Sequence, residues 1–162
     1  MTTTKISRLL QGSLPKFETI PMNPAFKAMY NLLQSDRRYK FEAYNFVRES
    51  LNQAQQLKMA EVAAAAGDDS NTDDEVVTRH ITGQQLCEAC RLHAIEQYGY
   101  MASKVLGSWG IQETGDFGEI VYNLIRIDQM KKSDADRRED FDDVYAFDTA
   151  FEPQFKLPTP SS

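Results

Sequence analysis

The longest uninterrupted helical pattern in the chain lies between Lys40 and Ala65. Apolar side chains recur there at spacings of three and four residues, at Tyr44, Val47, Leu51 and Ala54. This spacing places them on one stripe of an α-helix, and a helix of this length has to bury its stripe against other elements. The pattern therefore predicts a mainly α fold.

A glycine and an acidic stretch interrupt the chain after this helix. Gly67 ends the helical pattern, and the polar, acidic residues that follow cannot form part of a core. At 162 residues the chain fits one domain. The predicted organisation is a flexible basic arm at 1–23, a single helical domain at 24–152 interrupted by an acidic linker at 67–76, and a disordered tail at 153–162.

Capping signals indicate where three further helices begin. Asn23 is a good N-cap residue, and Pro24 suits the first helical position. Thr82 and Gln85 have the spacing of a capping box, in which each side chain bonds the backbone amide of the other residue. Thr114 is the predicted cap of the last of these helices.

Glycines indicate where two helices end. Gly99 and Gly110 each follow a helical pattern, and glycine readily adopts the left-handed backbone that closes a helix. Together, the capping and ending signals predict helices at 24–34, 40–65, 82–98, 100–109 and 114–130.

The order of the elements after the linker is compatible with two architectures. A short strand at 76–81, three helices, and a hairpin of strands at 129–132 and 144–147 would form a winged helix. The alternative is an all-helical bundle, in which Ser133 caps another helix that runs through Phe141. We therefore expect a mainly α (α+β) domain with a winged-helix-like C-terminal half, or an all-helical bundle.

The charge of the chain is divided between its two parts. Residues 1–60 carry nine Lys or Arg and four Asp or Glu, whereas residues 61–162 carry nine and twenty. We expect the two parts to attract each other within one domain. A basic arm that meets an anionic partner is the alternative.

Hydrophobicity and cysteine content bear on the compartment. No run of apolar residues is long enough to cross a bilayer, and the first twelve residues lack the apolar stretch of a secretory signal. Two cysteines are too few for a disulfide framework, which agrees with a reducing compartment. We expect a cytoplasmic protein that does not bind membranes.

Four side chains have the residue types of a zinc site, namely His80, Cys87, Cys90 and His93. Structural zinc cysteines usually lie on a tight turn on which two thiolates converge, whereas both cysteines here fall inside the predicted helix 82–98. We predict that the cysteines are small buried core residues and that the four side chains bind no metal.

No motif of a catalytic or nucleotide-binding site is present. The sequence lacks a Walker motif, a dinucleotide fingerprint, a nucleophile elbow and an H-E-x-x-H pattern. The acidic cluster between Asp134 and Asp143 lacks the glycine and the terminal glutamate spacing of an EF-hand loop. We predict a protein that is not an enzyme and that uses no cofactor.

Segments 38–51, 79–99 and 109–151 resemble an uncharacterised family of small conserved proteins associated with planctomycetes and verrucomicrobia. The most specific pieces are Glu42-Ala43-Tyr44, Arg79-His80 with Thr82-Gly83-Gln84, Asp116-Phe117-Gly118-Glu119-Ile120-Val121, and Arg138-Glu139-Asp140-Phe141. The resemblance implies a soluble bacterial protein and transfers no catalytic or binding residue, because the family has no assigned activity. The basic arm, the acidic linker and the two cysteines depart from the family pattern.

Four aromatic residues are candidates for a protein-binding surface, namely Trp109, Tyr145, Phe147 and Phe151. Aromatic side chains supply large contact energies when they fill a partner's pocket. The predicted function is therefore a non-enzymatic protein-interaction or regulatory module with a protein partner.

The alternative function is a nucleic-acid-binding regulator of winged-helix type that uses the basic N-terminal half. Its candidate patch consists of Lys27, Arg37, Arg38, Lys40 and Arg48. The charge of the rest of the chain disfavours this function, because the helix 114–130 and the expected wing are rich in carboxylates that repel phosphate.

Overall fold

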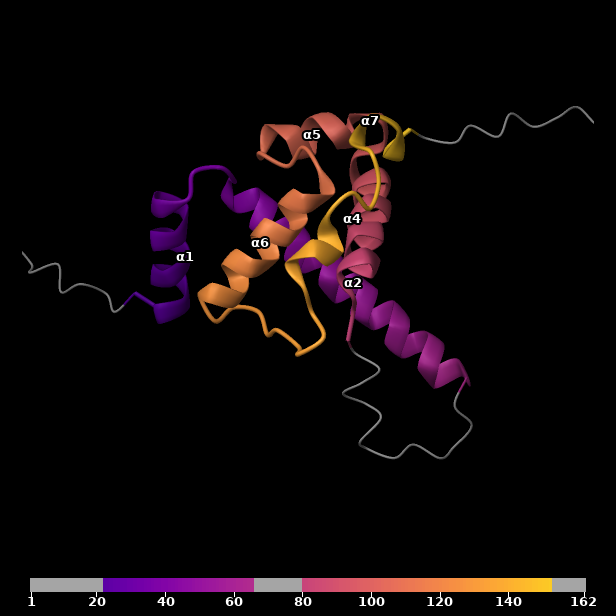
Figure 1. Cartoon of the computed structure of the whole chain (residues 1–162), viewed down its shortest axis with the longest axis horizontal. Coiled ribbons are helices and arrows are strands. Elements are labelled where there is room, and N and C mark those ends of the chain that lie inside the picture. Colours follow the sequence, from indigo (N-terminus) through magenta and orange to yellow (C-terminus); the bar gives the residue numbers. More distant parts are fainter. Residues whose placement is uncertain (1–21, 66–79, 153–162) are drawn as a thin grey trace, which may run out of the picture.

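The computed structural model describes residues 22–65 and 80–152, and within these residues the chain is mainly helical and contains no strand (Figure 1). Its helices are α1 (Pro24–Ser35), α2 (Phe41–Ala65), α4 (Gly83–Tyr98), η1 (Gly99–Met101), α5 (Ala102–Ser108), α6 (Thr114–Arg126), η2 (Arg138–Phe141) and α7 (Phe147–Ala150). The prediction of a mainly α fold is confirmed. The predicted tail and linker, and the predicted arm up to residue 21, lie outside the described residues.

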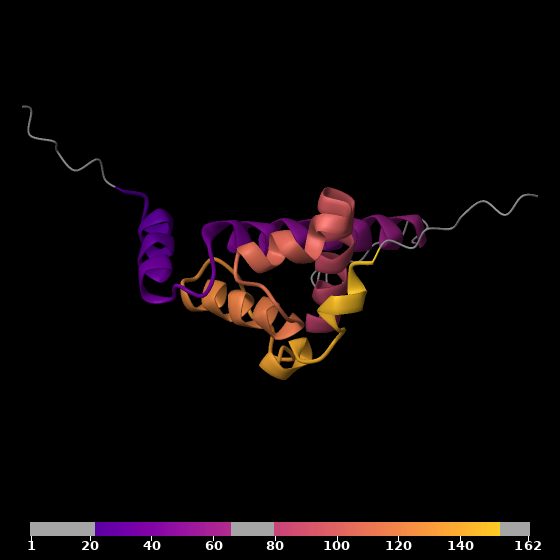
Figure 2. The same ribbon diagram turned by 90° about the horizontal axis from the view of Figure 1, so that it is seen from above.

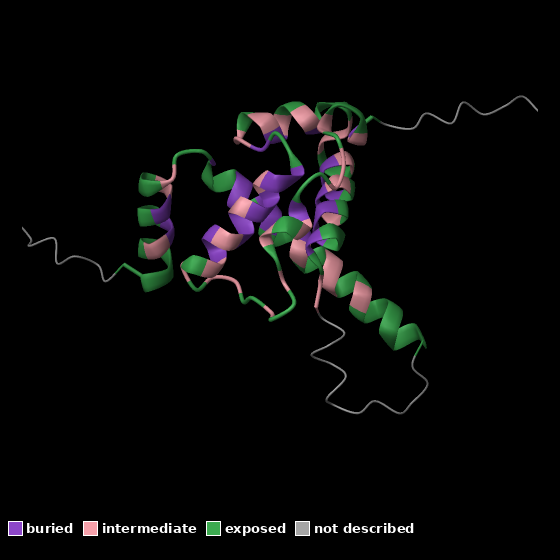
Figure 3. Ribbon diagram, viewed as in Figure 1, coloured by how far each residue is buried: buried purple, intermediate pink, exposed green. Residues whose placement is uncertain are grey.

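Three helices, α2, α4 and α6, surround the core. Figure 2 shows α2 and α6 in two layers, with α4 crossing near one end of α6. The helix α1 lies beside the other end of α6, away from α4 (Figures 1 and 2). The last turns of α2 extend past the other helices, and Figure 3 shows that this end is exposed.

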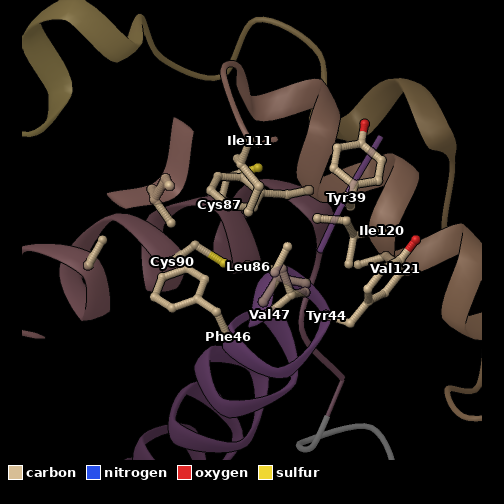
Figure 4. Packing of buried hydrophobic residues seen from close by; sticks show 14 of the residues in the cluster. Tyr39, Tyr44, Phe46, Val47, Leu86, Cys87, Cys90, Ile111, Ile120 and Val121 are labelled. Atoms are coloured by element: carbon tan, nitrogen blue, oxygen red, sulfur yellow. The ribbon is translucent and has the colours of Figure 1, made fainter. Parts of the chain in front are cut away.

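Most of the core consists of aliphatic, aromatic and small side chains from these three helices. Tyr44 and Val47 of α2 are fully buried, as are Cys87 and Cys90 of α4 (Figure 4). The helix α6 contributes the fully buried side chains of Phe117, Ile120 and Leu124. Burial of this apolar surface is the main favourable contribution to folding.

The predicted caps form at the starts of α1 and α4. The side chain of Asn23 accepts a hydrogen bond of 2.9 Å from the amide of Ala25. The amide of Gln85 donates to Thr82 Oγ1 at 3.2 Å, and the amide of Thr82 donates to Gln85 Oε1 at 3.0 Å, which completes a capping box.

The start of α6 differs from the prediction, because Thr114 is not its cap. Asp116 Oδ2 accepts hydrogen bonds from the amides of Gln112 and Glu113, at 2.8 and 3.1 Å, and Glu113 is the N-cap residue. The hydroxyl of Thr114 instead accepts a bond from the amide of Val144 at 3.2 Å. A tertiary contact therefore occupies the side chain that local spacing assigned to the cap.

The predicted hairpin of strands at 129–132 and 144–147 is absent, and this prediction was wrong. The helix α6 ends four residues early, at Arg126, because Asp128 adopts a left-handed backbone with φ of 58°. The amide of Gln129 then bonds the carbonyl of Leu124 at 2.9 Å, the pattern of a Schellman motif. The later segment turns into α7 at Phe147. Of the predicted strand 76–81, only the last two residues are described, and they are not in a strand.

The predicted helix from Ser133 through Phe141 also does not form. The amide of Ser133 donates to Asp136 Oδ2 at 2.8 Å, so the capping signal closes a turn, but the chain then forms only the short 3-10 helix η2. Phe141 is buried against two glycines, Gly83 and Gly118. To bring Phe141 to these glycines, the chain changes direction at the turn between Ser133 and Asp136. One continuous helix from Ser133 would not allow this change of direction.

Candidate functional site

The four candidate metal ligands do not converge. Cys87 and Cys90 are buried in the core, and burial raises the pKa of both thiols, that of Cys87 to about 12. His80 Nε2 lies 3.1 Å from Asp136 Oδ1, and the ring of His93 stacks on Phe46 at 5.1 Å. Across residues 22–65 and 80–152, no group of three or more His, Cys, Asp or Glu side chains could hold a metal ion.

Three of the four aromatic candidates pack against the core and against one another; Phe151 is buried, and Tyr145 and Phe147 are partly buried. Tyr145, Phe147 and Phe151 contact one another, with ring centroids 4.9 to 6.0 Å apart. The hydroxyl of Tyr145 donates to the carbonyl of Cys87 at 2.7 Å, which attaches this segment to α4. Trp109 differs from the other three, because it lines a hollow at the surface. That any of the four binds a partner stays a prediction.

Of the five basic candidates, one forms ion pairs and the other four are exposed at the surface. The guanidinium of Arg38 is paired with Asp36 at 2.7 Å and with Glu119 at 3.2 Å. The other four are exposed, and one of them, Arg48, donates to Gln129 Oε1 at 3.2 Å. The remaining three are Lys27, Arg37 and Lys40. One member of the predicted patch, Arg38, is therefore already paired with two carboxylates.

A polar network connects the turn between α1 and α2 to α6. Asp36 accepts hydrogen bonds from the Arg38 side chain at 2.7 and 3.0 Å and from the side-chain amide of Asn123 at 3.0 Å. The hydrogen bond from Arg38 holds the pKa of Asp36 well below its usual range. Asn123 also donates to the hydroxyl of Tyr44 at 3.0 Å. The network borders a groove of about 780 Å³, but its central charges bond one another, so we assign it a structural role.

Three of the stretches that carry the family resemblance meet around Phe141. A Cβ atom on Gly83 would lie 3.0 Å from the Phe141 ring, and one on Gly118 would lie 2.9 Å from it. Beside this contact, Arg138 Nε donates to Glu119 at 2.8 Å. Hydrogen bonding to Arg138 lowers the pKa of Glu119. These stretches therefore hold η2 against α4 and α6.

A groove between α2 and α4 is the strongest candidate for a binding site. One end is polar and has a volume of about 340 Å³. Both helices supply its lining, which consists of Glu49, Asn52, Gln53, Gln56, His93, Gln97 and Tyr98. The side chains of Asn and Gln present both hydrogen-bond donors and acceptors. This end is therefore suited to binding a polar chain.

The other end of the groove is aromatic and acidic. It has a volume of about 170 Å³ and is lined by Phe41, Glu42, Asn45, Phe46, Glu49, Tyr98 and Trp109. The ring of Trp109 lies 5.8 Å from that of Phe46 and 5.7 Å from that of Tyr98. The two hollows are neighbours, because Glu49 and Tyr98 line both of them, and we describe them together as the two ends of one groove.

Buried contacts hold the histidine of this groove in place. His93 is only 5% exposed, and its Nε2 atom lies 3.8 Å from Glu49 Oε2. Its Nδ1 atom is buried and has no hydrogen-bond partner within the described part of the chain. Although His93 lies beside a carboxylate, the lining residues of the polar end include no serine, threonine or cysteine that could act as a nucleophile.

Sequence reasoning missed most of this groove. Asn45, Glu49, Asn52 and Gln56 recur at spacings of four, three and four, which is the signal of one polar face of α2. That signal is present in the sequence, but polar helix faces are usually only solvated. The sequence does not show that His93 and Trp109, from two distant segments, lie against this face.

Comparisons with protein-family models, with curated proteins and with solved structures found no match for this chain. Membership of the family that the sequence resembles therefore stays a prediction. No helix among the described residues has the length and apolar content needed to cross a membrane.

Proposed function

We propose that the chain is a non-enzymatic protein-interaction module that binds a segment of a partner protein in the groove between α2 and α4. The observation that carries the proposal is that a polar hollow and an aromatic hollow lie next to each other and share Glu49 and Tyr98. A peptide presents backbone donors and acceptors along its length, together with side chains that need pockets. The amides of the polar end match the first requirement, and the rings of the aromatic end match the second.

The walls of the groove support this proposal because they are anchored helices. On α2, the groove residues Phe46 and Glu49 are each followed in the sequence by a fully buried residue, Val47 and Ser50. On α4, His93 is followed by the fully buried Ala94. A surface that is already ordered loses little conformational entropy on binding, which favours affinity.

A selection from a library of random displayed peptides tests the proposal. Peptides that bind the full chain are measured against Gln97→Trp, which places a bulky ring in the polar end. Gln84→Trp is the matched control, since Gln84 is also an exposed glutamine of α4 but does not line the groove. We expect Gln97→Trp to weaken binding by about tenfold or more and Gln84→Trp to leave it unchanged.

Two outcomes would contradict the proposal. One is that no peptide is enriched above a control selection without the protein. The other is that selected peptides bind Gln97→Trp and the unchanged chain equally well, which would place their site elsewhere. Binding of DNA or RNA at low salt, abolished by charge reversal at Arg37 and Arg38, would favour the alternative function instead.

A further inference from the structure

The aromatic end of the groove combines aromatic rings with carboxylates. Phe46, 3% exposed, forms its base, while Phe41, 51% exposed, lies at its rim. Trp109 and Tyr98 complete the aromatic lining, and their rings meet nearly edge to face, at 82°. We call these four residues the aromatic cage.

The charged side chains that line the aromatic end are all acidic. Glu42 and Glu49 line this end, and no Lys, Arg or His residue does. The side-chain amide of Asn45 donates to Glu49 Oε1 at 2.9 Å, which orients that carboxylate along α2. Aromatic faces carry negative partial charge as well, so rings and carboxylates create the same electrostatic preference.

We propose that the aromatic cage binds the positively charged head group of a lysine or arginine side chain from the partner segment. This inference rests on the proposed function, because it names the side chain that the partner inserts. An ammonium or guanidinium group gains cation–π contacts with the rings and charge-assisted contacts with Glu42 and Glu49.

A neutral apolar side chain suits this end less well. It would cover the two carboxylates and remove their water without offering a compensating charge or hydrogen bond. The volume of about 170 Å³ also lies below the roughly 300–1,000 Å³ of sites that hold whole small molecules. The end is therefore suited to one side-chain head group.

The net charge of the chain, −6, favours the same partner. A negatively charged protein attracts a basic segment over long range and raises its rate of association. This attraction is screened by salt, so binding through the cage is expected to weaken as ionic strength rises.

The cage contains its own reporter, because Trp109 is the single tryptophan of the chain. The experiment titrates the full chain with N-acetyl-lysine methylamide and N-acetyl-arginine methylamide while Trp109 fluorescence and its indole NMR signal are recorded. The neutral comparators are N-acetyl-norleucine methylamide and N-acetyl-citrulline methylamide. Each probe is raised to about 50 mM, since ligands of this size bind with dissociation constants of roughly millimolar order.

We expect saturable changes at Trp109 with both cationic probes and binding at least about fivefold weaker with the neutral ones. The variant Glu42→Gln with Glu49→Gln should weaken the cationic probes by about fivefold or more and leave the neutral probes unchanged. Glu96→Gln is the matched control, because Glu96 is exposed on α4 and lines neither end of the groove.

No change at Trp109 with the cationic probes, or equal binding of charged and neutral probes, would overturn the inference. The two proposals fail in different ways. Groove-dependent peptides that show no enrichment of lysine or arginine would leave the proposed function standing and remove the cage. Binding of the cationic probes without any groove-dependent peptide would leave the cage standing and remove the proposed function.

Discussion

The backbone amide of Lys40 donates a hydrogen bond of 3.1 Å to the carbonyl oxygen of Trp109. This bond joins the residue before α2 to the residue after α5, although the two lie far apart in the sequence. It places the Trp109 ring beside Phe46. The aromatic end of the groove therefore depends on a loop contact as well as on helix packing.

Replacement of Gly110 by alanine is expected to disrupt this contact. A Cβ atom at Gly110 would lie 2.0 Å from the carbonyl oxygen of Arg38, and the φ of 98° strains any other residue. We expect Gly110→Ala to lower the free energy of unfolding by about 3 kcal/mol. Urea denaturation measures the loss, and the near-ultraviolet circular dichroism of Trp109 reports the local change.

Gly107→Ala is the control for that substitution. Gly107 lies in α5, and a Cβ atom there would meet nothing within 4 Å. Alanine stabilises a helix relative to glycine, so this variant should gain up to about 1 kcal/mol. Equal stabilities for the two variants would show that the close approach of Gly110 to Arg38 is not required.

Gly118→Ala is expected to destabilise the docking of η2 even though it lies within a helix. Helix propensity favours alanine by about 1 kcal/mol, but the new Cβ would lie 2.9 Å from the buried Phe141. We expect a net loss of about 2 kcal/mol. In Phe141→Ala the obstructing ring is gone, so Gly118→Ala should there be neutral or stabilising. A double-mutant cycle by urea denaturation without coupling would contradict this account.

Asp36→Asn is expected to lower stability at neutral pH and to reduce sensitivity to acid. The hydrogen bond from Arg38 makes the pKa of Asp36 lower in the folded than in the unfolded chain. The Asp36 carboxylate therefore contributes its full stabilisation above the unfolded pKa. This stabilisation is lost as the pH falls from the unfolded pKa towards the folded pKa. We expect a loss of about 2 kcal/mol at neutral pH, which shrinks between about pH 4 and pH 2.

Asp134→Asn is the matched control for this pH dependence, since Asp134 is exposed and outside the network. The free energy of unfolding of Asp134→Asn should equal that of the unchanged chain at every pH tested. Chemical denaturation across the acidic range gives both curves. A constant difference between Asp36→Asn and the unchanged chain down to the lowest pH would show that the Asp36 carboxylate contributes no pH-dependent stability.

The two thiols are expected to react slowly in the folded chain. Burial raises the pKa of Cys87 to about 12, so its thiol is neutral near pH 8. We expect the thiol reagent dithiobis(nitrobenzoate) to react about 100-fold more slowly with the folded than with the unfolded chain. The unfolded chain releases these protons first, so folding stability should fall as the pH rises from about 9 to about 12. Rapid modification of the folded chain would contradict the burial of Cys87 and Cys90.

Local signals predicted the helices and several of their ends. Asn23 and the Thr82–Gln85 box form the caps that their spacing indicates. Gly99 and Gly110 end their helices with positive φ, as expected of glycine. These features involve residues a few positions apart, so the sequence contains all that is needed to predict them.

The errors lie where another contact, distant or local, outcompetes the preference that the residue pattern indicates. Thr114 has the chemistry of a cap, but its hydroxyl bonds Val144, and Asp116 takes over the capping role. The order of elements suggested a strand at 129–132, but the Schellman closure of α6 at Asp128 ends the helix earlier and no strand follows. In each case the deciding partner is one that periodicity does not reveal.

The sequence by itself determined that this chain is mainly helical, where most of its helices begin and end, and that its cysteines belong to the core. The groove was decided only by the tertiary structure, which brings Glu49, His93 and Trp109 together from three segments. The physical reason is that helix formation depends on neighbouring residues, whereas a binding surface depends on which helix faces remain uncovered after packing.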